Sequence, residues 1–155
     1  MSSPPLKQFT LIRILNAPRE LVYRVWTEDK LMTEWWGTDE FACTVDAQQG
    51  GKLVINKLNG AHIPAFPITG VFYEVQPLAK LVFGTKAFKN ADGTFGTENM
   101  HIITFVDLGN GKTKLTVNVS ILSMSDALMP FLEGFEEGWS ISLDRLSELV
   151  TKIHS

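Results

Sequence analysis

The feature that most limits the fold is the apolar spacing of the C-terminal stretch between Met129 and His154. Apolar side chains recur there at steps of three or four, at Phe131, Phe135, Trp139, Leu143, Leu146, Val150 and Ile153. This spacing predicts one long α-helix of about six turns with a continuous apolar face, which the rest of the chain has to cover. Gly134 and Gly138 weaken such a helix. We therefore expect close packing at these glycines or space left for something else.

Residues 41–120 have a different pattern, typical of antiparallel strands. Short apolar or alternating runs are separated by turn sequences such as QQGG, NADGTFG and DLGNGKT, which predicts a meander of roughly six strands. If GNG centres one hairpin turn, His101 pairs with Val119 and Ile103 with Val117. Side chains alternate with a period of two, so these residues share one apolar face, with His101 at its far end.

The N-terminal part predicts a lead, a strand and two short helices. Residues 1–5 are expected to be disordered and residues 7–15 to form the first strand. Pro18 suits the first turn of a helix. Thr27 is expected to cap a second helix that stops at Gly37.

Two adjacent tryptophans end the second predicted helix. Neighbouring helical residues point about 100° apart, so Trp35 and Trp36 cannot face the same way. We expect Trp35 to lie in the core and Trp36 towards an edge, where a pocket mouth or a partner surface would be.

These elements together predict an α+β domain. A curved antiparallel sheet of about six to seven strands wraps around the long C-terminal helix, with two short helices after the first strand. Residues 6–155 are expected to form this single domain. Such an arrangement can leave a cavity between the sheet and the helix.

Composition argues against several classes of partner and site. The 155 residues carry a net charge of −3 and no dense run of Lys or Arg, so neither nucleic acid nor a membrane surface is expected as a partner. Cys43 is the one cysteine and is expected to be a strand residue rather than a nucleophile. The three histidines are far apart, and no phosphate-binding, dinucleotide-binding or serine-hydrolase motif occurs, so no metal or cofactor is expected. Because no signal core or bilayer-spanning run is present, we expect a cytoplasmic protein.

His101 is the best single polar candidate for a site. It is expected either as a sheet-end histidine partly in water or as a pocket histidine that orients a ligand or transfers a proton. Asn99, not Glu98, shares its face, so a Glu98–His101 pair is disfavoured. Phe135 and Trp139 share one face of the long helix, where packing and ligand contact are compatible. The candidate ligand-binding residues are Trp36, His101, Ile103, Phe131, Phe135 and Trp139.

Five stretches are together similar to a known family: FTLIRILNAPRELVYRVWTEDKLMTEWWG, GGKLVI, ITGVFYEVQPLAKLVF, GKTKLTV and EGWSISLDRLSELV. In this order they resemble the activator-of-heat-shock-protein-ATPase homologue family of the START-like (SRPBCC, birch-pollen-allergen-like) superfamily. The resemblance covers nearly the whole chain and implies the helix-grip fold. Many similar single-domain members are bacterial and functionally uncharacterised, and chaperone activation is not implied, because it belongs to larger proteins with a second half. Many relatives resemble HxxGW where this chain has FEEGW, so Phe135 stands in place of a histidine.

Three functions from different classes fit these observations. The first is a non-enzymatic domain that binds a small hydrophobic or aromatic molecule between the sheet and the last helix. The second is a protein-interaction module, either a homodimer or a chaperone-related adaptor, that uses apolar residues around Trp35 and Trp36. The third is a cyclase-like or hydrolase-like enzyme with His101 as acid or base. We rank them in this order.

Overall fold

The computed structural model describes residues 4–36, 41–58, 64–89 and 91–154. Within these ranges the elements in chain order are β1 (Lys7–Leu15), α1 (Arg19–Thr27), α2 (Asp29–Trp35), β2 (Phe41–Val45), β3 (Lys52–Leu58), β4 (Pro64–Gln76), β5 (Lys80–Lys89), β6 (Phe95–Gly109), β7 (Lys112–Met124), the 3-10 helix η1 (Asp126–Phe131) and α3 (Gly134–His154). The strands form one seven-stranded antiparallel sheet in the order β1-β7-β6-β5-β4-β3-β2. The predicted α+β helix-grip fold is confirmed.

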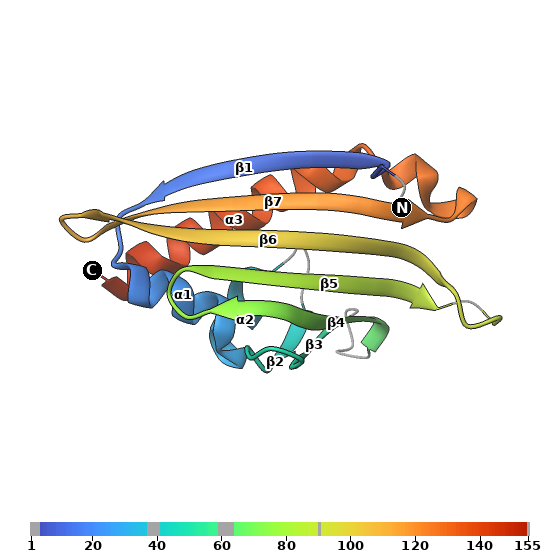
Figure 1. Cartoon of the computed structure of the whole chain (residues 1–155), viewed down its shortest axis with the longest axis horizontal. Coiled ribbons are helices and arrows are strands. Elements are labelled where there is room, and N and C mark those ends of the chain that lie inside the picture. The colour runs from blue at the N-terminus through green and yellow to red at the C-terminus, as the bar shows by residue number, and fades with distance from the viewer. Residues whose placement is uncertain (1–3, 37–40, 59–63, 90, 155) are drawn as a thin grey trace.

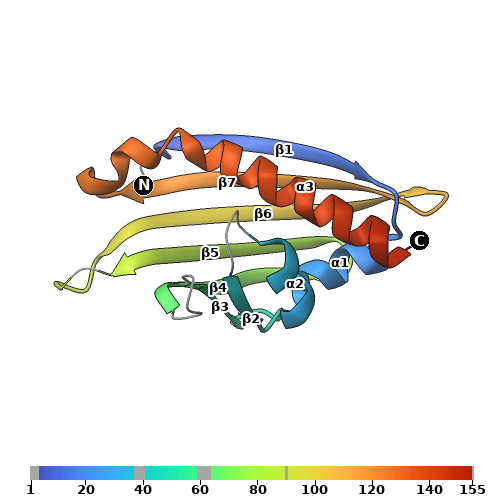
Figure 2. The same ribbon diagram turned by 180° about the vertical axis from the view of Figure 1, so that it is seen from behind.

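The helices lie on one face of the curved sheet. α3 crosses behind β1, β7 and β6, and its C-terminal end lies beside α1 (Figures 1 and 2). We call this face of the sheet the inner face. The opposite side, which no helix of the described residues covers, is the outer face (Figure 1).

The strand predictions agree closely with the structure. β1 runs over the predicted residues 7–15. In the hairpin of β6 and β7, His101 pairs with Val119 and Ile103 with Val117, as expected. The turn at its end places Asn110 at φ 54°, between two glycines that also have positive φ. The predicted lead at 1–5 lies largely outside the described residues, as do Gly37 and His62.

Two predicted details of the first helices are wrong. Pro18 does not lie in the first turn of α1 but is its N-cap residue, with extended backbone (φ −68°, ψ 153°). Thr27 does not cap α2. It is the last residue of α1, and its hydroxyl donates to the Tyr23 carbonyl oxygen 2.9 Å away. This bond holds the side chain against α1 instead of at the beginning of α2. Glu28 occupies the N-cap position of α2 instead.

The predicted C-terminal helix forms in two pieces. Pro130 lies inside η1, and α3 begins only at Gly134. Proline lacks the N–H that an α-helical ladder needs, which accounts for the break. Phe131 therefore belongs to η1, where 62% of its surface is exposed. Apart from the chain neighbours and the helix's own backbone, no described heavy atom lies within 4 Å of the place where a Cβ at Gly134 or Gly138 would stand, so close packing does not explain these glycines.

All four tryptophans of the chain form one cluster that joins the three α-helices. Trp26 of α1 contacts Trp35 at a ring-centroid distance of 4.5 Å and stacks on Trp139 of α3 at 6.1 Å and 14°. Trp36 meets Trp139 edge to face at 4.9 Å. Trp35 is fully buried, as expected, and its Nε1 donates to the Val25 carbonyl at 2.7 Å. The cluster therefore fixes α3 over the inner face.

Replacing two glycines should change stability in opposite directions. Gly138→Ala should raise the free energy of unfolding by about 0.5–1 kcal/mol, because alanine favours a helix and its Cβ meets nothing. Gly70→Ala should lower it by about 1–3 kcal/mol, because its Cβ would lie 2.6 Å from the Gly84 carbonyl oxygen. Urea unfolding monitored by circular dichroism measures both. A destabilised Gly138→Ala protein would contradict the open space beside α3.

Candidate functional site

A cavity of about 600 Å³ lies between the inner face, η1 and the beginning of α3. Its volume falls within the range of roughly 300–1,000 Å³ typical of small-molecule pockets. Most of the described residues that line it are apolar or aromatic. They are Trp36, Ile68, Thr85, Ala87, Phe88, Thr97, Asn99, His101, Val119, Leu128, Phe131, Phe135 and Trp139. None of these side chains is a carboxylate, an ammonium or a guanidinium.

The floor of the cavity carries a short polar row. Alternate residues of β6 point to the inner face, which brings Thr97, Asn99 and His101 into line. Thr85 of β5 pairs with Asn99 in the ladder and joins the row from the neighbouring strand. The Thr97 hydroxyl donates to the Asn99 Oδ1 at 3.3 Å. The polar groups thus gather on two adjacent strands, while the aromatic residues come mainly from η1 and α3.

His101 is held rigidly at one end of this row. Only 2% of its surface is exposed. Its ring stacks on Phe83 at 4.5 Å and 12°, and its Nδ1 lies 3.3 Å from the Phe83 carbonyl oxygen. A carbonyl only accepts, so Nδ1 carries the proton and donates. Nε2 is left as an acceptor, and no described residue donates a hydrogen bond to it.

Burial lowers the pKa of His101 to about 4, against the smaller opposing effect of its bond to the Phe83 carbonyl. The charged imidazolium would lose its hydration in this apolar surrounding. At neutral pH the side chain is therefore an uncharged hydrogen-bonding group. The interpretation of His101 as a sheet-end histidine partly in water is wrong.

The roof of the cavity is aromatic. Trp139 and Phe135 come from successive turns of α3, and Phe131 from η1. Trp139 also lies 5.6 Å from the His101 ring, so the roof and the floor meet at this pair. The same tryptophan that fixes α3 onto the sheet therefore closes one end of the cavity.

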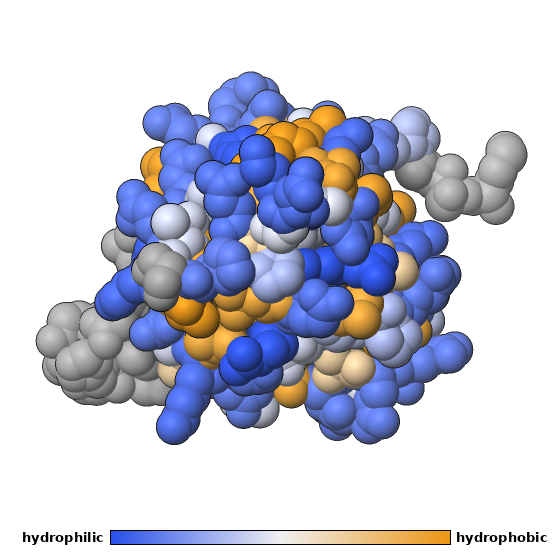
Figure 3. Space-filling view, turned by 90° about the vertical axis from the view of Figure 1, so that its left-hand side faces the viewer, coloured by the Kyte–Doolittle hydropathy of each residue, from blue (hydrophilic) through white to orange (hydrophobic). Residues whose placement is uncertain are grey.

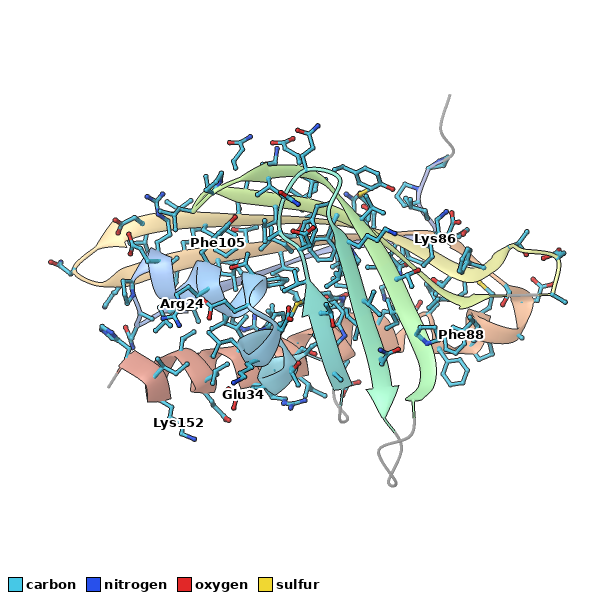
Figure 4. All side chains as sticks on the ribbon, turned by 90° about the horizontal axis from the view of Figure 1, so that it is seen from below. Arg24, Glu34, Lys86, Phe88, Phe105 and Lys152 are labelled. Carbon is cyan, nitrogen blue, oxygen red and sulfur yellow. The ribbon has the colours of Figure 1, made fainter. Side chains whose placement is uncertain are left out.

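Phe88 lies beside the roof in an unusual backbone conformation. Its φ of 59° is in the left-handed region, which is strained for a bulky residue. Strict alternation would place Ala87 and Phe88 on opposite faces of the sheet, but both line the cavity. Gly96 makes room, because a Cβ there would lie 2.9 Å from Phe88 Cβ and 2.8 Å from Leu128 Cδ1. Figure 4 shows Phe88 near the η1 end of the molecule, remote from Phe105.

The structure brings together five of the six residues proposed from the sequence. Trp36, His101, Phe131, Phe135 and Trp139 line one cavity. Ile103 does not line it. This residue is fully buried in the core, two positions further along β6.

Several lining residues were missed by sequence reasoning. Alternation along β5 from the buried Phe83 would have found Thr85 and Ala87. No sequence signal marks Phe88, because its contact with the cavity depends on the left-handed backbone.

The remaining polar candidates lie outside the cavity. Glu98 forms an ion pair with Lys86 at 3.5 Å beside a hollow on the outer face, so the disfavoured Glu98–His101 pair does not form. Burial raises the pKa of the Cys43 thiol to about 11, which makes it a poor nucleophile. His154 is exposed on the last turn of α3. No group of three or more metal-binding side chains occurs in the described ranges.

The sequence of residues 16–151 matches the family model described as Activator of Hsp90 ATPase homolog 1-like protein. The chain belongs to this family. No curated protein matches it. Nor does any helix of the described residues have the length and hydropathy needed to span a membrane.

Solved structures place this family member among proteins of the same START-like fold. A Chromobacterium violaceum protein is 25% identical, with a TM-score of 0.72 and coverage of 93% of this chain and 97% of its own. A Rhodobacter sphaeroides protein at 14% identity has a TM-score of 0.76 and coverage of 97% of each chain. DynU16, a protein in the dynemicin biosynthetic locus, is 19% identical with a TM-score of 0.68, and the match covers 93% of this chain and 47% of DynU16.

The depressed pKa of His101 predicts acid-sensitive stability. The unfolded chain takes up a proton on this residue near pH 6.5, whereas the folded protein does so only near pH 4. The stabilising contribution of the neutral imidazole is complete above pH 6.5, decreases as pH falls below that value and is lost by about pH 4, a total of about 3 kcal/mol. Urea unfolding between pH 7 and pH 4 should show this loss, and His101→Phe should reduce it.

The control is His154→Gln, which changes an exposed histidine and should keep the wild-type pH dependence. An unchanged pH dependence in His101→Phe would show that His101 is not the buried group responsible.

Proposed function

We propose that the protein is a non-enzymatic domain that binds a small hydrophobic or aromatic molecule in the cavity between the sheet and α3. The observation that carries this proposal is a cavity of about 600 Å³ with aromatic walls and a few polar groups on one side. Small-molecule sites commonly combine these features.

An enzymatic role has less support. Efficient general acid–base catalysis needs a group whose pKa lies near the working pH. The pKa of His101 is lowered to about 4, and no carboxylate or second histidine stands beside it among the described lining residues. Phe135 stands where the HxxGW pattern of many relatives has a histidine, and it adds no titratable group. The cavity of this chain is therefore better suited to holding a molecule than to converting it.

The interaction module remains the second candidate, but not at its predicted surface. Trp35 is fully buried and Trp36 is 9% exposed, so they form no exposed apolar patch. Exposed apolar side chains occur instead along the outer face, among them Tyr73 and Ile102. At the end of the molecule seen in Figure 3, apolar side chains occur in separate groups between hydrophilic ones. Analytical ultracentrifugation that gives the sedimentation coefficient of a monomer at every concentration up to millimolar would exclude a homodimer.

Blocking the cavity should abolish binding of a neutral aromatic probe. Ala87→Phe places a ring in the cavity, whereas Val71→Phe places one in the hollow of about 510 Å³ on the outer face. Titration with biphenyl should quench tryptophan emission in the wild type, because Trp36 and Trp139 line the cavity. Ala87→Phe should weaken binding by about tenfold or more, a change of ~1.4 kcal/mol in binding free energy.

The control variant separates the two hollows. Val71→Phe should bind like the wild type. The reverse result, with binding lost in Val71→Phe and retained in Ala87→Phe, would move the site to the outer face. Circular dichroism melting of both variants shows whether they fold.

A further inference from the structure

We infer that the cavity takes an uncharged aromatic molecule that donates a hydrogen bond, through a phenol-like hydroxyl, to Nε2 of His101. This inference rests on the proposed function and names the chemical class of the ligand. Three properties of the cavity support it: His101 presents a hydrogen-bond acceptor, the described lining residues carry no charge, and the helix side of the cavity consists of aromatic rings.

The hydrogen-bonding direction is fixed by His101. Its Nδ1 is committed to the Phe83 carbonyl, so Nε2 can only accept. No described residue donates to Nε2, and the residue as a whole is 2% exposed and lines the cavity. Nε2 is therefore an acceptor that is open to a ligand in the cavity, and an apolar ligand that covered it would leave it without a donor, at a cost in binding free energy. A ligand hydroxyl that reaches Nε2 supplies this hydrogen bond, whereas an ether, ketone or carboxylate oxygen cannot donate.

Thr85 offers a second polar contact beside the first. It is 5% exposed and lines the cavity. It stands opposite Asn99 in the ladder, two residues from His101 along the neighbouring strand. A hydroxyl both donates and accepts. One ligand hydroxyl can therefore donate to His101 and accept from Thr85 or the Asn99 amide.

The charge of the lining excludes ionised ligands. None of the described lining residues is Lys, Arg, Asp or Glu, and His101 is uncharged at neutral pH. A carboxylate or phosphate would lose its hydration here without gaining a counter-charge. Its oxygen would also face the lone pair of Nε2. A fatty-acid anion or a phospholipid head group is therefore a poor fit.

The roof favours flat rings over alkyl chains. Trp36, Phe135 and Trp139 present ring surfaces to the cavity, and Phe88 and Phe131 add two more near η1. Aromatic pairs gain from offset or edge-to-face contact beyond the burial of area. Trp36 and Trp139 already contact each other edge to face, with ring centroids 4.9 Å apart.

Three biphenyls of similar size test this assignment: 4-hydroxybiphenyl, 4-methoxybiphenyl and biphenyl-4-carboxylate. In the wild type, tryptophan quenching should give an affinity for the phenol about tenfold higher than for the ether, with the carboxylate weakest. In His101→Phe, a ring can still stack on Phe83 but accepts no hydrogen bond. Its affinities for the phenol and the ether should agree to within about twofold.

A second measurement does not depend on how the variant folds. In wild-type protein labelled with ¹⁵N-histidine, the phenol should shift the Nε2 resonance of His101 upfield, and the ether should not. Equal wild-type affinities for phenol and ether, or a carboxylate that binds as tightly as the phenol, would overturn the inference while the proposed binding function stands. Failure of all three compounds to bind would instead count against the proposed function.

Discussion

The contact of Trp139 with Trp26 and Trp36 is the interaction on which the rest of the structure depends. It joins α3 to α1 and to the end of α2, and so fixes the long helix over the inner face. Towards the N-terminus of α3 the helix and the sheet enclose the cavity, which Phe135 and Trp139 line from the helix. One aromatic cluster thus sets both the fold and the end wall of the site.

Features that reduce stability gather at this cavity. His101 buries an imidazole where an apolar ring would resist acid better, and Phe88 holds a left-handed backbone. The glycines of α3 weaken the helix at the same end. Functional sites are expected to contain residues and backbone conformations that are less stable than the alternatives at the same positions. Their concentration around one apolar space supports a binding role more strongly than any single residue does.

The sequence predicted what depends on periodicity and missed what depends on backbone detail. The hairpin register placed His101 opposite Val119, and the helical spacing placed Phe135 and Trp139 on one face, because both follow from fixed repeats. The break between η1 and α3 comes from Pro130, which the apolar spacing passes over, and the orientation of Phe88 depends on a left-handed backbone that no apolar pattern encodes. The full burial of His101 was also missed, because it comes from rings on other elements, Phe83 and Trp139.

A crystal structure of the protein with 4-hydroxybiphenyl tests the central claim most directly. The account predicts electron density for the compound between the inner face and α3, in contact with Trp139. It also predicts that the hydroxyl oxygen lies within hydrogen-bond distance of Nε2 of His101. Density for the compound in the outer-face hollow beside Lys86 and Tyr73, with the cavity empty, would contradict the account.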